Sequence, residues 1–253
     1  MTDTLVLCYH AVSRSWPSPL AVTPDQLRSH LERLLRRGYK PVTFEAAVTA
    51  PRAPRTLAVT FDDAYRSIHR LAFPILRELG VPATVFAPTD YIGLEAPMAW
   101  PGITTWSDGP YRSELIPVDW TELNELADAG WEIGSHSCSH ARLTQLTDSA
   151  LASELHGSRS VCEARTGREC RSIAYPYGDL DDRVAAAAKA AGYVVGAALD
   201  RAHVNRGQLQ SPRIGVYRID DDWRFRLKAS RPGRGLRSAV WSAARTIGAG
   251  VAR

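Results

Sequence analysis

Short apolar runs alternate along this chain with longer segments in which apolar residues recur at helical spacing. The runs 5–9 and 56–61 are apolar or β-prone throughout, which predicts two buried strands. Between them, leucines recur every three or four residues, and the segment opens with Thr23 and Pro24 and closes with Gly38. These are typical start and stop residues of a helix, so a helix is expected between them.

The same alternation continues to the end of the predicted domain. Further strands are expected at 39–43, 83–87, 131–135, 172–175, 193–198 and 213–216, and helices at 45–49, 67–79, 119–129, 146–165, 181–191 and 221–228. Strands that alternate with helices predict a parallel sheet. Without internal repeats, the pattern favours an α/β fold: a distorted single-domain (β/α) barrel of about seven parallel strands, related to the TIM barrel. The barrel is expected to span 1–229, followed by a tail at 230–253.

Polar residues stand directly after several of the predicted strands, on the face where barrel enzymes place their chemistry. Asp62 and Asp63 follow one strand, and His136 and His140 follow another. Neighbouring carboxylates can serve one site only where the strand ends and the backbone turns. Two buried carboxylates need a compensating cation. Cys138 lies between the histidines and is read either as a further ligand or, preferably, as a small buried filler.

Two imidazoles and one carboxylate form a metal site with open positions, which is the catalytic rather than the structural arrangement. One divalent ion is expected there; Zn²⁺ suits the ligands best, and Co, Ni, Fe or Mn would also bind. Such an ion lowers the pKa of bound water from 15.7 to about 7 and polarises a carbonyl oxygen. A second carboxylate beside it can take the remaining proton, which describes hydrolysis of an amide or an ester.

Three segments carry a family resemblance. They are Thr60-Phe61-Asp62-Asp63, His136-Ser137-Cys138-Ser139-His140 and Tyr175-Pro176-Tyr177-Gly178. In order and spacing they resemble the motifs of the polysaccharide deacetylases, the NodB-homology family or carbohydrate esterase family four. The resemblance extends over about residues 5–220. It implies a distorted (β/α) barrel that hydrolytically removes acetyl groups from N-acetylated sugars.

The resemblance also implies a role for each motif residue. Asp62 would be the general base, and the metal ligands would be Asp63, His136 and His140. The backbone N–H of Tyr177 would help to hold the substrate oxyanion. Trp100 and Trp106 lie in a long Pro-, Gly- and aromatic-rich connection at 88–118. They are candidates for stacking on a sugar ring, and the alternative is that they only pin this loop to the body.

Two positions depart from the family pattern. Many members carry an Arg before the Pro-Tyr motif, where this chain has Ala174, and many use a late His as general acid, yet no His follows His203. The chain is closer to a subgroup, resembling the poly-N-acetylglucosamine deacetylases, that begins with a Tyr-His strand. His10 is therefore expected to be the general acid. Arg213 is the candidate for the missing Arg, the alternative being an ordinary surface or ion-paired side chain.

Charge is unevenly distributed along the chain. The net charge is +4, but eight basic and no acidic residues follow from Trp223 onward, so residues 1–222 carry −4. A nucleic-acid partner is therefore not expected. The tail 230–253 reads either as a basic amphipathic helix on an anionic membrane or as a disordered end. No apolar run reaches bilayer length, no leader is recognised and no CxxC pair occurs, which favours the cytoplasm. Membrane contact of the tail would place the protein at the inner face of the membrane.

Two other functions stay open at this stage. One is a catalytically silent homologue that binds glycans, and the other is an esterase or amide hydrolase that uses the same residues on a non-sugar substrate. The substrate of a deacetylase is also open between a polysaccharide, a lipid-linked sugar and a small glycoside.

Overall fold

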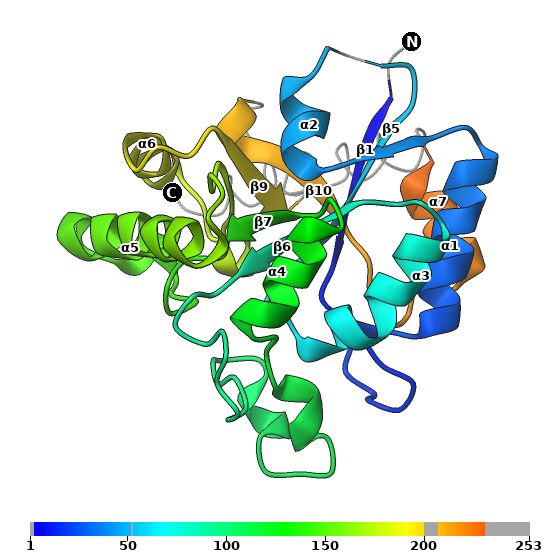
Figure 1. The fold of residues 1–253 in the computed structure, drawn as a ribbon, viewed down its shortest axis with the longest axis horizontal. Helices are drawn as coiled ribbons and strands as arrows, with labels where there is room; N and C mark the ends of the chain where they lie inside the picture. The colour runs from blue at the N-terminus through cyan, green and yellow to red at the C-terminus, as the bar shows by residue number, and fades with distance from the viewer. Residues whose placement is uncertain (1–2, 52, 200–206, 231–253) are drawn as a thin grey trace, which may run out of the picture.

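A closed ring of parallel strands forms the centre of the computed structural model, which describes residues 3–51, 53–199 and 207–230. The ring strands are β1 (Thr4–Tyr9), β5 (Thr56–Phe61), β6 (Ala83–Ala87), β7 (Glu132–Ser135), β8 (Ser172–Ala174), β9 (Val195–Leu199) and β10 (Ser211–Gly215). They follow one another in the order β1-β10-β9-β8-β7-β6-β5, and the pairing of β1 with β5 closes the ring (Figure 1). The predicted parallel (β/α) barrel is confirmed.

One strand lies outside the ring and distorts it. β4 (Lys40–Val42) pairs with the first half of β5, from Thr56 to Ala58, on the edge whose second half pairs with β6. The other edge of β5 pairs with β1 along its whole length. A separate pair, β2 (Ala11–Val12) and β3 (Ala21–Val22), follows β1 at the end where the ring strands finish.

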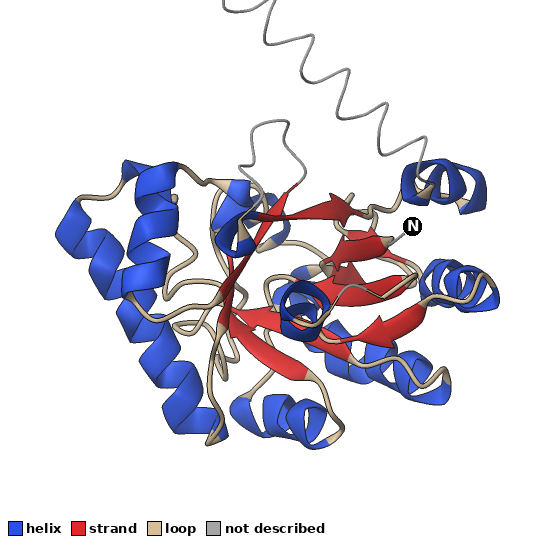
Figure 2. Cartoon of the chain, turned by 90° about the horizontal axis from the view of Figure 1, so that it is seen from above, coloured by secondary structure: helices blue, strands red, loops and turns tan. Residues whose placement is uncertain are grey.

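The described residues contain seven α-helices. They lie around the outside of the strands (Figure 2). They are α1 (Pro24–Arg36), α2 (Phe44–Thr49), α3 (Phe73–Glu78), α4 (Trp120–Asp128), α5 (Asp148–Thr166), α6 (Asp182–Ala190) and α7 (Asp222–Ala229). Thr23 caps α1 as predicted, because its side chain accepts a hydrogen bond from the backbone N–H of Gln26. Among these helices, none is long and apolar enough to cross a lipid bilayer.

The helix expected at 67–79 is interrupted. It begins as a π-helical turn, Ile68–Ala72, and continues as α3. The reason is Pro74, the second residue of α3, which has no N–H and whose ring would clash with the carbonyl one turn earlier. A wider turn before the proline relieves that clash.

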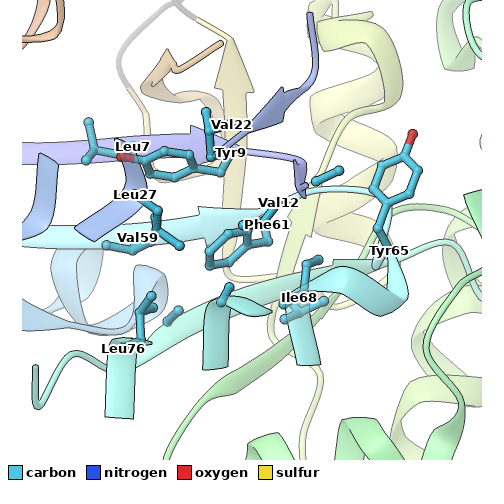
Figure 3. Packing of buried hydrophobic residues seen from close by; sticks show 14 of the residues in the cluster. Leu7, Tyr9, Val12, Val22, Leu27, Val59, Phe61, Tyr65, Ile68 and Leu76 are labelled. Atoms are coloured by element: carbon cyan, nitrogen blue, oxygen red, sulfur yellow. The ribbon is translucent and has the colours of Figure 1, made fainter. Parts of the chain in front are cut away.

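Alternate residues of the ring strands face the helices or the barrel interior. Tyr9 and Phe61 face the helices, with ring centroids 5.7 Å apart, and pack with Leu27 and Leu76 (Figure 3). Buried residues of the alternate set form a second cluster together with Phe44, the first residue of α2. The strand members of this cluster are Val6, Ala58, Phe86, Ala174, Val195 and Ala197. On β5 this inward series continues through Thr60 to Asp62, so the interior becomes polar where the strands end.

Candidate active site

The backbone turns sharply at each of the three motif segments. In the described part of the chain, five non-glycine residues have a left-handed backbone: Asp63, Ala64, Ser137, His140 and Tyr177, with φ between 55° and 70°. Such conformations cost free energy and concentrate at functional sites. At the end of β5 the turn allows both neighbouring carboxylates to face one site, as the sequence pattern required.

Asp63, His136 and His140 converge on one point. The Asp63 Oδ1 atom is 3.3 Å from Nε2 of His136 and 3.2 Å from Nε2 of His140. The three potential ligand atoms lie within 4.8 Å of one another, and none of these residues is more than 5% exposed. The carboxylate and the two imidazoles are thus in place to ligate one ion from a single side.

The hydrogen bond of His136 supports this interpretation. Its Nδ1 lies 2.8 Å from the carbonyl oxygen of Ala174, which can only accept, so Nδ1 carries the hydrogen. In the neutral ring, Nε2 then presents a lone pair to Asp63 Oδ1. Two lone-pair atoms this close repel each other unless a proton or a metal cation lies between them. The residues therefore fit a bound divalent ion, with His136 oriented by its carbonyl partner as metal-ligating histidines usually are.

Opposing effects set the pKa values of these groups. Burial acts to raise the pKa of Asp63, but hydrogen bonds from His136 and His140 offset it and hold that pKa well below the ordinary range. Burial acts to lower both histidine pKa values. Asp63 reverses this for His136, whose pKa is raised, but not for His140, whose pKa is lowered. The carboxylate is therefore ionised and can bind a cation directly.

Arg213 compensates the second carboxylate. From β10, its Nη1 and Nη2 atoms donate to Oδ1 and Oδ2 of Asp62 at 2.6 and 2.8 Å, and Nη1 also donates to Thr60 Oγ1 at 2.9 Å. The Arg213 residue is 1% exposed, so this is a buried, bidentate pair. Burial alone would raise the pKa of Asp62, but Arg213, aided by His136, lowers it to about 2. Many family members carry an Arg at the position of Ala174, on β8. In this chain the guanidinium beside Asp62 comes instead from Arg213, on β10.

A second group of potential metal ligands lies next to this pair. Cys8, His10 and Asp62 also have ligand atoms within 4.8 Å of one another, and the Cys8 thiol donates to Asp62 Oδ2 at 3.4 Å. Both oxygens of Asp62 already bind the Arg213 guanidinium. A cation here would face that positive charge, so the Asp63 group is the better candidate for a metal site.

The remaining predicted residues surround a cavity of about 370 Å³. His10 lines it and stacks on Tyr217, with ring centroids 6.5 Å apart. Trp100 is only 5% exposed and stacks on His140 at 4.0 Å, so one face of its ring holds a potential ligand rather than a sugar. Trp106 is half-buried at the edge of the cavity.

Cys138 is not one of the converging residues. Its thiol donates to the carbonyl oxygen of Glu154 at 3.4 Å, and the residue is half-buried, so the structure supports neither a ligand nor a fully buried filler. The carboxylate of Glu154 accepts hydrogen bonds from the backbone N–H groups of Cys138 and Ser139, at 2.8 and 3.0 Å. Glu154 on α5 therefore fixes the loop between the two histidines. Nothing in the sequence pattern distinguished it, or Tyr217, from other surface residues.

A parallel barrel with a carboxylate and two imidazoles buried where its strands end defines a (β/α)-barrel protein with potential metal ligands on the face where such barrels place their chemistry. Within that class, this chain belongs to the polysaccharide deacetylase family, whose sequence model matches residues 49–196. The matched segment includes Asp62, Asp63 and both histidines, but not His10 or Arg213.

Individual relatives are distant. The chain is 26% identical to YxkH of Bacillus subtilis over 208 residues, which is 80% of this chain and 67% of YxkH. It is 26% identical to the poly-β-1,6-N-acetyl-D-glucosamine N-deacetylase of Staphylococcus aureus over 171 residues, 63% of this chain and only 54% of the relative. A solved polysaccharide deacetylase from Bacillus cereus has the same fold, with a TM-score of 0.73 at 23% identity over 90% of this chain and 69% of that one.

Proposed function

We propose that this protein is a metal-dependent hydrolase that removes acetyl groups from N-acetylated sugars. The observation that carries the proposal is the convergence of Asp63, His136 and His140 beside an ionised Asp62, in a member of the polysaccharide deacetylase family. The named activity of the staphylococcal relative supports the choice of an N-acetylated sugar. A divalent ion, most favourably Zn²⁺, would be held by the three converging side chains.

When bound, the ion would supply an activated water molecule and polarise the acetyl carbonyl. The other steps fall to side chains of this chain. Asp62, held in one orientation by Arg213, accepts the proton that water loses during attack on the acetyl carbon. The backbone N–H of Tyr177, set by its left-handed turn, stabilises the developing oxyanion. His10, which also lines the cavity, gives a proton to the departing amine nitrogen, and Trp106 and the edge of Trp100 contact the sugar.

The first test is metal-dependent release of acetate from a panel of N-acetylated sugars. Activity is expected to disappear on chelation and to return with Zn²⁺. Asp63→Asn should weaken metal binding by about 100-fold or more because it removes the charged ligand, and metal content after dialysis measures this. Asp128→Asn, on the exposed side of α4, is the matched control and should keep its metal.

Other outcomes would replace the proposal. Full activity in the metal-free protein would contradict it, and so would an Asp63→Asn variant that retains the ion. Acetate release from esters or non-sugar amides alone would favour the esterase or amide-hydrolase alternative. Glycan binding with a retained ion but no hydrolysis would favour a silent homologue.

We also propose peripheral contact of the C-terminal segment with an anionic membrane. The predicted tail after Ser230 lies outside the described residues, but its sequence holds five arginines and no acid. Just before it, Ile219, Trp223 and Leu227 are 65%, 62% and 52% exposed. All four cysteines are unpaired, which agrees with a reducing compartment at the inner face.

Sedimentation with phosphatidylglycerol vesicles tests the contact. The full chain is expected to bind, a chain ending at Ser230 to bind more weakly, and neither to bind neutral vesicles, because basic residues near an anionic surface contribute about 1 kcal/mol each. Equal binding of the two chains to anionic vesicles would contradict this proposal.

A further inference from the structure

The loops around the active-site cavity are fastened to one another, and this limits how a substrate can enter. On one side, the segment after β10 meets the loop between β2 and β3, where the backbone N–H of Arg218 donates to the carbonyl of Pro19 at 2.9 Å. That loop then meets the long segment 88–118. Ser13 Oγ donates to Glu114 at 2.6 Å, and the Trp16 and Trp106 rings are 5.9 Å apart and perpendicular.

The contacts continue around the opposite side. Trp100 of the long segment stacks on His140, as described above. Arg142, just beyond that histidine, has its guanidinium carbon 4.2 Å from the ring centroid of Tyr177. Leu199 packs so closely on Gly178 that an added Cβ atom there would lie 3.1 Å from it. We call these loops around the cavity the rim. Among the described residues, successive rim loops contact one another from Arg218 to Leu199, and residues 200–206 are not among the described residues.

The reacting groups lie at the bottom of this enclosure. Asp62 and Asp63 are each 3% exposed. An acetyl group can therefore reach them only if the sugar that carries it also enters the cavity. At about 370 Å³, the cavity is near the lower end of the ~300–1,000 Å³ range of small-molecule sites. An interior residue of a polysaccharide has neighbours on two sides and needs a groove open at both ends, whereas the loops from Pro19 to Trp106 are in continuous contact along one side of the cavity.

We propose that this site accepts one N-acetylated sugar residue at a time, at the end of a glycan or as the lone sugar of a small or lipid-linked glycoside, and excludes interior residues of a polymer. The inference rests on the proposed deacetylase function and specifies its substrate class.

The test is the position of deacetylation in an end-labelled pentamer of N-acetylglucosamine. Mass spectrometry should find the acetyl group missing from a terminal residue, at least 10-fold faster than from the three interior ones. Calorimetry with the Asp62→Asn variant would measure its affinity for N-acetylglucosamine oligomers of increasing length. This affinity should rise little once the oligomer is longer than two sugar units. A groove would instead gain affinity with each unit.

Opening the rim should relax this selectivity. Trp106→Ala and Ser13→Ala each remove a contact between the two loops and should raise the share of interior deacetylation. Trp223→Ala, on exposed α7, is the control and should leave the pattern unchanged. Interior residues deacetylated as fast as terminal ones would overturn the inference and leave the deacetylase intact. Absence of acetate release from every N-acetylated sugar would overturn both.

Discussion

Asp62→Asn is expected to lower the rate of acetate release by about 10²- to 10⁴-fold, the usual contribution of a general base. The asparagine amide has nearly the size of the carboxylate but cannot take a proton from water. Because Asp62 binds Arg213 and does not belong to the Asp63 group, metal content should remain that of the wild type. The measurement is kcat for acetate release alongside metal analysis of the same preparation.

Two comparisons make this result specific. Thermal melting must show that the variant is folded, since its amide N–H group now faces the Arg213 guanidinium. Asp63→Asn should show the opposite pattern, in which metal is lost together with activity. An Asp62→Asn enzyme with wild-type kcat would remove Asp62 as the base, whereas one that lost its metal would show that both carboxylates are ligands.

Arg213→Met is expected to destabilise the protein by roughly 3–5 kcal/mol at pH 7, because it leaves the Asp62 carboxylate buried without a partner. The methionine roughly fills the volume of the aliphatic stem, so the lost charge dominates the effect. The double variant Asp62→Leu/Arg213→Met should regain much of the stability that the single variant loses. Urea unfolding of the wild type, Asp62→Leu, Arg213→Met and the double variant measures the interaction free energy between the two side chains.

The same pair has a defined pH dependence. In the wild type, the pKa of Asp62 is about 2 in the fold, against an ordinary 3.8, so its stabilisation is complete above about pH 4 and is lost as pH falls toward 2. That shift corresponds to about 2 kcal/mol. In Arg213→Met, burial raises the pKa of Asp62 instead. The stability difference between variant and wild type should therefore narrow as pH falls from 7 to 4, and a constant difference would contradict the charge argument.

The strand ends were predictable from sequence because Asp62, Asp63, His136 and His140 each follow a short apolar run. The pairing of Arg213 with Asp62 was only a candidate, since the two residues are 151 positions apart and meet because β10 and β5 both flank β1. Local patterns do not specify that closure. Likewise, β4 resembles the other strands in sequence, and only the competition with β6 for one edge of β5 excludes it from the ring.

The contacts between the loops around the cavity could not be predicted from the sequence either. Trp16 has no periodic context that distinguishes it, and its contact with Trp106 joins loops that follow β1 and β6, two strands that β5 separates in the ring. Trp100 was a candidate for stacking on a sugar ring, and the structure places it in the lining of the cavity. Its stacking partner, His140, follows from the tertiary fold of segment 88–118.

The position of β10 also bears on how the protein is made. During synthesis, β1, β5 and β7 leave the ribosome well before the strand that carries Arg213. A nascent chain can thus assemble all three side chains that fit the metal ion while Asp62 still has no guanidinium beside it and the sheet has an open edge at β1. When β10 pairs with β1, it closes the ring and brings Arg213 to Asp62 in the same step. A chain that stalls before residue 211 therefore has an open sheet edge, which favours aggregation, and an Asp62 carboxylate that no guanidinium orients.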